Sequence, residues 1–150
     1  MKLNRLFAIG AVSSALFLSA CANTPEATDN DVTTENLVRG GEWVVEDIGG
    51  KGLIDSSHVS IVFMEDNRVG GSSSCNNYSG EYQLNGSKFT VGDNMASTRM
   101  ACAPALMNQE ESFLKLLMNV SQARLGDHGE LLLSTPDGET IRAFQSSPKP

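Results

Sequence analysis

Short segments in which apolar and polar residues alternate run through most of this chain, and turn residues separate them. A strand that is buried on one face needs such an alternation, because successive side chains point to opposite sides of the sheet. The pattern predicts antiparallel strands joined by tight turns. We expect these strands over residues 42–45, 59–64, 68–71, 80–84, 87–91, 130–134 and 139–144.

Two of the separating turns predict hairpins. Asn85-Gly86 stands between two alternating runs and indicates a type I′ turn. Pro136-Asp137-Gly138 separates the last two expected strands. Trp43, the only tryptophan of the chain, lies in the first expected strand. We expect it to fill the core rather than to bind a ligand.

The segment 104–120 has a helical period instead. Its apolar residues recur at spacings of three, four and seven, and Pro104 suits a first helical turn. Leu106, Phe113, Leu117 and Val120 form one stripe, and Met107, Leu114 and Met118 form the adjoining one. We interpret Glu110 and Glu111 as a solvated face. The predicted fold is therefore α+β, a small antiparallel β-sheet or barrel-like domain with one amphipathic helix.

The first 20 residues are typical of an export signal. Lys2 and Arg5 precede a short apolar run over residues 6–18, and small residues follow it. The run is too short for a membrane-spanning helix. We therefore expect residues 1–20 to be removed, and we divide the rest into a disordered tether (21–38), one domain (39–145) and a loose tail (146–150). The tether is polar and has almost nothing to bury.

The end of the signal resembles the bacterial lipobox. Leu18-Ser19-Ala20 precedes Cys21, which in such signals becomes the lipidated N-terminus. The resemblance implies a diacylglycerol on the Cys21 sulfur and a further acyl chain, such as palmitate, on its amine. Several acyl chains hold a protein firmly to a bilayer. Because Ala22 and not Asp follows, we expect an outer-membrane lipoprotein that faces the periplasm. An ordinary cleaved signal is the alternative.

The charge of the chain bears on its partners. Removal of residues 1–20 takes two of the 11 basic residues and none of the 18 acidic ones, which leaves a net charge of −9. Nucleic acids and anionic headgroups attract clusters of Lys and Arg. We therefore expect no nucleic-acid partner, and we expect contact with the membrane through the lipid anchor alone.

Two cysteines remain once Cys21 is acylated. Cys75 and Cys102 are an even pair in an oxidising compartment, which favours a disulfide. Closing a loop of roughly 28 residues is worth about 3.5 kcal/mol in the chain-entropy model. Two reduced thiols are the alternative. A metal site is less favoured, because His58 and His128 are both far from the cysteines in sequence. We predict neither a metal nor a cofactor.

Two further motifs resemble the signatures of META domains, a family that includes the heat-shock protein HslJ. The segment 71–82 reads Gly-Ser-Ser-Ser-Cys-Asn-Asn-Tyr-Ser-Gly-Glu-Tyr, and the segment 95–102 reads Met-Ala-Ser-Thr-Arg-Met-Ala-Cys. The matching positions are Asn76, Tyr78, Gly80 and Tyr82 in the first motif and Met95, Thr98, Arg99 and Met100 in the second. The resemblance extends over roughly residues 40–144. Ser74 departs from it, since Gly usually precedes the cysteine.

The motif residues favour a structural role over a ligand site. Asn76 and Asn77 suit left-handed turn conformations. We expect Thr98 and Arg99 to anchor the second motif against the first, with Arg99 donating to carbonyls. The two motifs would then form a structural knot fastened by Cys75 and Cys102. A ligand site built from the same residues is the alternative.

Enzyme motifs are not evident in the sequence. Ser72, Ser73 and Ser74 offer hydroxyl groups and His58 or His128 a base, but no nucleophile-elbow context surrounds them. No glycine-rich phosphate loop precedes a helix. We therefore predict a protein without catalytic residues, and hydrolysis is a distant alternative.

Two classes of function remain. One is an envelope or stress-response accessory that binds an apolar ligand, a peptide or a partner protein. META domains are similar in fold to pilot lipoproteins that bind apolar segments, which implies a cleft between barrel and helix. The other is a structural envelope component without a ligand. A large apolar cleft beside Met107, Leu114 and Met118 would favour the first class, and a filled barrel would favour the second.

Overall fold

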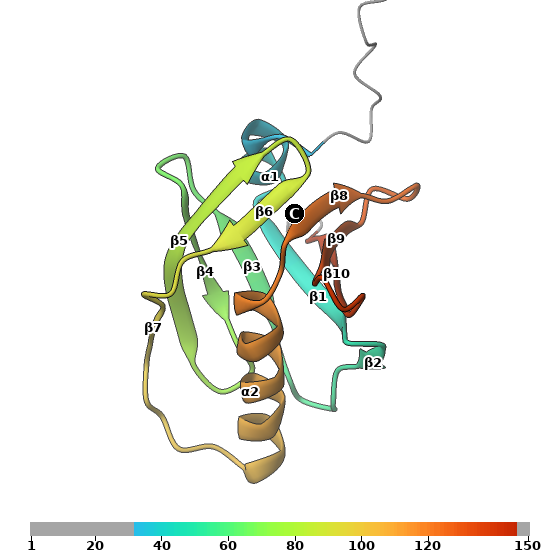
Figure 1. Cartoon of the computed structure of the whole chain (residues 1–150). Coiled ribbons are helices and arrows are strands. Elements are labelled where there is room, and N and C mark those ends of the chain that lie inside the picture. Colours follow the sequence, from blue (N-terminus) through green and yellow to red (C-terminus); the bar gives the residue numbers. More distant parts are fainter. Residues whose placement is uncertain (1–31, 147–150) are drawn as a thin grey trace, which may run out of the picture.

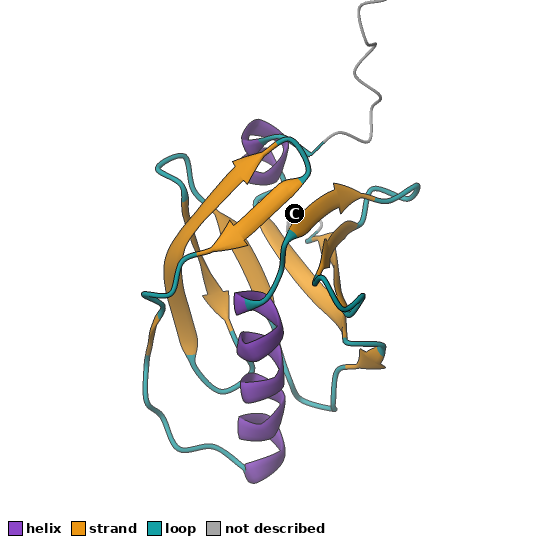
Figure 2. Cartoon of the chain, viewed as in Figure 1, coloured by secondary structure: helices purple, strands orange, loops and turns teal. Residues whose placement is uncertain are grey.

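The computed structural model describes residues 32–146 as an antiparallel β-barrel with two helices (Figures 1 and 2). The strands are β1 (Glu42–Ile48), β2 (Lys51–Gly52), β3 (Ser60–Phe63), β4 (Arg68–Ser72), β5 (Asn77–Asn85), β6 (Lys88–Val91), β7 (Ala96–Ser97), β8 (Gln122–Leu125), β9 (Leu131–Ser134) and β10 (Thr140–Gln145). The helices are α1 (Thr34–Arg39) and α2 (Pro104–Met118).

The barrel closes because the first long strand pairs with the last. Within the described residues, eight strands follow one another around it in the order β1, β3, β4, β5, β6, β8, β9 and β10. β10 pairs with β1, with Val44 opposite Phe144. The short strands β2 and β7 lie outside this ring and pair with β1 and β5. The predicted antiparallel α+β fold is confirmed, and the sheet is a closed barrel.

The barrel is narrowly joined between β6 and β8. These strands share one paired position, Lys88 with Gln122. Backbone hydrogen bonds from Phe89 N to Ser121 O (3.0 Å) and from Ala123 N to Ser87 O (2.8 Å) flank it. The C-terminal end of α2 lies beside this junction and leads directly into β8 (Figure 1).

Side chains fill the barrel interior. Phe63, Tyr82 and Phe89 pack ring against ring, with centroids 5.2 Å apart for Phe63 and Tyr82 and 5.6 Å for Tyr82 and Phe89. α2 adds Phe113 and Leu117, both with no exposed surface. Trp43 is also fully buried, as its sequence position predicted. The interior is therefore a packed core of aromatic and aliphatic side chains.

The N-terminal helix α1 corrects the predicted boundary of the tether. We expected disorder through residue 38, but Thr33 caps a helix whose Leu37 is fully buried. The buried Trp43 Nε1 donates to Leu37 O at 3.0 Å. Six residues with one large apolar side chain carry too little periodicity to predict such a helix. The signal, Cys21, the tether up to residue 31 and the tail from residue 147 lie outside the described residues.

Local details differ from the sequence predictions for identifiable reasons. Asn85 pairs with Lys88, so Gly86 and Ser87 are the turn residues. Only Gly86 has a positive φ (57°), which excludes the predicted type I′ turn. β8 was missed because only Ala123 of its four residues is buried. α2 begins at the expected Pro104. Neither helix of the described segment has the length and apolar character needed to cross a bilayer.

Candidate functional site

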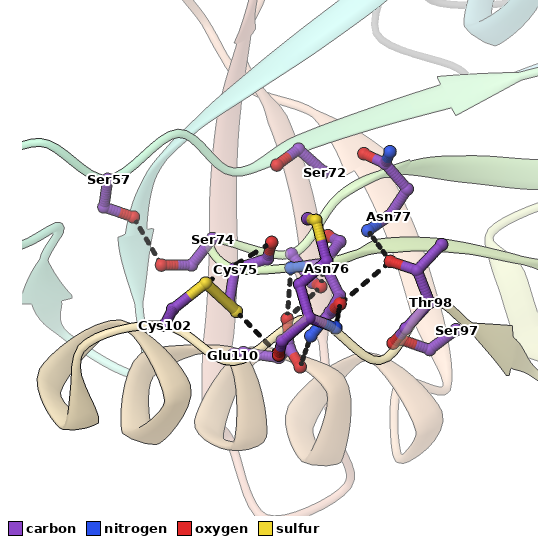
Figure 3. The surroundings of a disulfide bond; sticks show 12 residues. Ser57, Ser72, Ser74, Cys75, Asn76, Asn77, Ser97, Thr98, Cys102 and Glu110 are labelled. Carbon is purple, nitrogen blue, oxygen red and sulfur yellow. Dashed lines mark hydrogen bonds between the residues drawn. A yellow bond between two sulfur atoms is a disulfide. The ribbon is translucent and has the colours of Figure 1, made fainter.

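A disulfide joins the two sequence motifs (Figure 3). Cys75 lies in the turn between β4 and β5, and Cys102 lies in the segment that leads from β7 to α2. Their sulfurs are 2.11 Å apart, and their Cα atoms are 5.9 Å apart. The predicted pairing of these cysteines is confirmed. We call the turn 73–76, the segment 98–102 and Glu110 together the knot.

The turn of the knot is strained at one residue. Ser73 N donates to Asn76 O at 2.7 Å and closes the turn. Ser74 has a φ of 101°, in the region that favours glycine, whereas Asn76 and Asn77, which we expected there, do not have positive φ. Ser74 thus occupies the position at which the motif usually carries Gly. A second close approach precedes it, because a Cβ on Gly71 would lie 2.2 Å from Ser60 O.

Asn76 is the centre of the knot. Its Oδ1 accepts hydrogen bonds from Met100 N (2.7 Å) and from Thr98 Oγ1 (2.9 Å). Its Nδ2 donates to Glu110 Oε1 at 2.9 Å. The side chain is 5% exposed and is bonded at both of its polar atoms by the protein. Thr98 anchors the second motif against the first, as expected, and also accepts from Asn77 N at 3.1 Å.

Glu110 extends from α2 into the turn (Figure 3). Its Oε2 accepts from Ser73 Oγ and from Asn76 N, each at 2.7 Å. Burial raises the pKa of this carboxyl, but hydrogen bonds from Ser73, from the Asn76 side chain and from the backbone of Asn76 and Cys75 outweigh it and lower the pKa overall. Our interpretation of Glu110 as part of a solvated face is wrong.

The sequence did contain a signal for the role of Glu110. It lies four residues after Leu106, three before Phe113 and seven before Leu117, so it belongs to the apolar stripe of the helix. A carboxylate in a buried stripe needs hydrogen-bond donors. Glu111, its neighbour, is exposed as expected.

Gln109 ties α2 to a second loop beside the knot. Its Nε2 donates to Ser57 Oγ, and its Oε1 accepts from Ile54 N at 2.8 Å. Ser57 Oγ in turn donates to Ser74 Oγ at 2.9 Å. Two consecutive side chains of α2 therefore each hold a loop: Gln109 holds the loop that contains Ile54 and Ser57, and Glu110 holds the turn 73–76.

The aromatic and glycine positions of the first motif serve packing. Tyr78 is buried, its hydroxyl donates to Ser60 O at 3.0 Å, and burial raises its pKa. Tyr82 is 1% exposed in the barrel core. A Cβ on Gly80 would lie 3.4 Å from Met95 Cγ, so this glycine lets Met95 of the second motif lie close to β5.

Arg99 and Met100 differ from the other motif residues. Arg99 is exposed, and within residues 32–146 its guanidinium has no hydrogen bond or ion pair. The prediction that Arg99 donates to carbonyls is wrong. The Met100 side chain is 56% exposed, although its backbone N–H binds Asn76. The knot therefore uses the backbone at position 100 and leaves both side chains in solvent.

The polar groups of the knot form hydrogen bonds with one another. The Ser73 hydroxyl is fully buried and bonded to Glu110, so it is not presented to a substrate. The carbonyl of His58 accepts from Ser72 Oγ at 2.9 Å, but its ring pairs with Glu42, with Nε2 3.1 Å from Glu42 Oε1. This hydrogen bond is the main cause of the lowered pKa of Glu42. In the part of the chain described here, no group of three His, Cys, Asp or Glu side chains is placed to hold a metal.

α2 also carries the apolar surface that the sequence singled out. Met107 is 47% exposed, Met118 is 48% exposed and Leu114 is half-buried. Two cavities border α2, but Ser112 and other residues from a different side of the helix line them. The three residues thus form an exposed stripe rather than the wall of either cavity.

Comparisons with known proteins agree with the sequence motifs. The family model of the META domain matches residues 35–148. A protein structure determined by NMR is 31% identical, with a TM-score of 0.61 over 76% of this chain and 95% of that chain. An NMR structure from Burkholderia xenovorans is 20% identical, with a TM-score of 0.60 over 94% of this chain and 99% of the other.

A third structure extends the likeness of the fold. It is the crystal structure of a DUF4847 family protein from Bacteroides vulgatus, 17% identical, with a TM-score of 0.54 over 79% of this chain and 100% of that chain. The comparison with curated proteins gives no match.

Proposed function

Because the chain belongs to the META domain family, we propose that it is a membrane-anchored, non-catalytic envelope protein that binds a partner protein through the exposed stripe of α2. The stripe consists of Met107, Leu114 and Met118. The observation that carries this proposal is the exposure of two large apolar side chains on α2, Met107 (47%) and Met118 (48%). A role in the envelope stress response is part of the proposal.

The geometry of the stripe suits a protein partner. Its members are seven and four residues apart, so they share one helix face. Methionine adapts its shape to irregular apolar surfaces. Glu111 is exposed on the same face, between Met107 and Met118. The expected partner is therefore an apolar protein segment that also carries a cationic side chain.

The absence of catalysis is supported by the state of the polar groups. The hydroxyl, amide and carboxylate groups of the knot are bonded to one another, and Ser73 is fully buried. A nucleophile needs a base within hydrogen-bond reach and an open approach for the substrate. Glu110 lies within hydrogen-bond reach of Ser73 Oγ (2.7 Å), but Ser73 has no exposed surface and therefore offers no open approach for a substrate.

The anchor is tested by fractionation. Cys21 lies outside the described residues, and a lipid on it would hold the α1 end of the domain next to the bilayer through residues 22–33. Cys21→Ser should move the protein from the membrane fraction to the soluble periplasmic fraction, whereas Ser19→Ala should leave it in the membrane. An unchanged distribution of the Cys21→Ser variant would refute the anchor.

The stripe is tested by position-specific photo-crosslinking in intact cells. A crosslinker at Met107 or Met118 should capture one and the same protein, and a crosslinker at Asn108 should not, because Asn108 lies on another face. With the crosslinker at Met107, Met118→Asp should abolish capture, and the matched Asn108→Asp should leave it unchanged. Equal capture from all three positions would contradict the proposal.

A structural component without a partner is the second candidate. The buried aromatic and aliphatic side chains that pack the barrel interior favour it. It predicts no position-dependent crosslink from the stripe, although the Cys21 result would be the same.

A further inference from the structure

A cleft lies beside α2, on a different side from the stripe. Its walls come from the turn between β1 and β2, from the C-terminal half of α2 and from the hairpin between β9 and β10, and its volume is about 480 Å³. We call it the α2 cleft. Ligand pockets in proteins have volumes of about 300–1,000 Å³, so the cleft is large enough for a small molecule.

Two of the residues that line the α2 cleft are apolar and largely buried. Ile48 and Leu116 are the apolar residues that line it. Gly49 has a φ of 62°, and its N–H donates to Thr140 O at 2.8 Å, which fixes the turn against β10. Because Gly49 has no side chain, the space between Leu116 and Glu139 stays open at this point.

The positively charged residues of the cleft come from different elements than the negatively charged ones. Lys51 of β2 and Lys115 of α2 supply two ammonium groups, and Asp137 and Glu139 of the last hairpin supply two carboxylates. No nitrogen–oxygen pair among these four side chains lies within 4.0 Å, since the ion pairs of the described residues are Arg39 with Glu35 and His58 with Glu42. The cleft therefore presents both signs of charge, and these charges do not neutralise each other by direct contact.

A narrower groove continues the cleft along the helix. It has a volume of about 290 Å³, shares Ile48, Lys51 and Ser112 with the cleft, and extends to Ile54 and Ala105. From Ala105 to Asn119 the helix rises about 21 Å, the length of some six residues of extended chain. The groove thus leads from the charged residues of the α2 cleft to apolar groups at Ile54 and Ala105.

We propose that the α2 cleft binds the zwitterionic end groups of a short peptide with small apolar side chains. The peptide carboxylate would lie between Lys51 and Lys115, and its ammonium group would lie against Asp137 and Glu139. Its side chains would cover Ile48 and Leu116. A ligand with only a negative charge would pair with the two lysines and leave the two carboxylates of the cleft without a partner. A ligand with only a positive charge would leave the two lysines without a partner.

Most of this site lies on another side of α2 from the proposed partner surface, and Lys115 lies between them, about 60° from Met118. Ser112 and Asn119, in the cleft, lie about 120° around α2 from Met107 and Met118, at 100° per residue. If no partner protein crosslinks to the stripe, the α2 cleft is therefore still expected to bind the peptide. Loss of peptide binding would equally leave the crosslink intact.

The experiment is an NMR titration of the purified full-length protein in detergent with trialanine. The expected result is a saturable set of amide shifts confined to residues around Gly49, Ser112, Asn119 and Gly138. N-acetyl-trialanine and trialanine amide, which each lack one charge, should bind at least fivefold more weakly. Equal affinity for all three peptides, or the absence of saturable shifts, would overturn the proposal.

Variants locate the site on the protein. Lys115→Gln should weaken trialanine at least fivefold and should reduce the advantage of a free carboxylate. Glu139→Gln should do the same for the free ammonium group. Lys88→Gln, on β6, removes the same charge away from the cleft and should change nothing. An equal loss in all three variants would indicate non-specific electrostatic binding and would refute the assigned site.

Discussion

Helix α2 has polar side chains on two sides. Those on one side are hydrogen-bonded within the protein, and those on the other side line a cavity. On the knot side, Glu110 accepts hydrogen bonds from Ser73 and Asn76 and is part of the fold. On the cleft side, Lys115 faces a cavity and has no ion-pair partner in the described residues. A buried polar group must find its partners within the protein, whereas an exposed one can exchange water for a ligand.

This difference separates the residues of a family motif from the residues of a binding site. The motif positions Asn76, Thr98 and Cys102 hold the two motif segments together, and Asn76 also binds Glu110 of α2. The cleft positions Lys51 and Asp137 lie outside both motifs. We therefore expect substitutions in the knot to change stability and substitutions in the cleft to change binding.

The largest effect should come from the disulfide. Replacement of both Cys75 and Cys102 by Ser should lower the free energy of unfolding by about 3.5 kcal/mol, because the reduced unfolded chain gains loop entropy. For a domain of this size, the melting temperature should fall on the order of 10 °C. The same fall should follow reduction of the native protein, and reductant should not affect the double variant. A melting temperature that responds to neither change would contradict the structural role of the bridge.

Glu110→Gln should destabilise the fold by about 2 kcal/mol. The new amide group brings a donor to a site where Ser73 and Asn76 already donate, so a buried hydrogen bond is lost. Urea denaturation measures the change. Glu111→Gln is the matched control on the exposed side, and we expect it to remain within 0.5 kcal/mol of the native protein. Equal effects of the two substitutions would show that Glu110 does not hold the turn.

The Glu110 carboxyl should make the free energy of unfolding depend on pH. Its folded pKa lies below its ordinary value of 4.5. The stabilisation is therefore fully present above about pH 4.5 and is lost as the pH falls through the folded pKa. The native protein should lose more stability than Glu110→Gln between pH 6 and pH 3, as measured by denaturation at each pH. Parallel pH profiles would exclude Glu110 as a source of acid sensitivity.

Ser74→Gly should stabilise the protein by about 1 kcal/mol. Glycine relieves the strain of a φ of 101°, and this gain exceeds the loss of the hydrogen bond from Ser57. Ser74→Ala is the control, because it removes the hydroxyl and keeps the strain. It should therefore destabilise the fold. If both variants shift the unfolding midpoint in the same direction, backbone strain at Ser74 is not the cause.

The smallest effects on stability should come from the cleft. Lys115→Gln and Glu139→Gln remove exposed charges that have no ion-pair partner in residues 32–146. Each should change the free energy of unfolding by less than about 0.5 kcal/mol. Thermal melting of the two variants checks this. A loss of 2 kcal/mol or more would place these residues with the knot.

The parts of the fold that follow from local patterns were predictable from the sequence. The strands around Trp43 and Phe89 have a clear alternation, and α2 has its Pro104 and its apolar stripe. α1 and β8 were missed because each buries a single side chain, Leu37 or Ala123, and tertiary contacts decide their structure.

The candidate sites were predictable to different degrees. The knot could be predicted because the even pair of cysteines and the two family motifs indicate it, although the expectation of a solvated face for Glu110 is wrong. The α2 cleft could not be predicted in this way. Lys51, Lys115 and Asp137 come from three segments that only the closed barrel brings together.

Trialanine titration of two variants most directly tests the proposed division of the polar groups of α2 between the fold and a ligand. Below its melting temperature, Glu110→Gln should bind trialanine as the native protein does, although it is less stable. Lys115→Gln should keep native stability and bind at least fivefold more weakly. If Glu110→Gln loses binding while still folded and Lys115→Gln keeps it, the division is wrong.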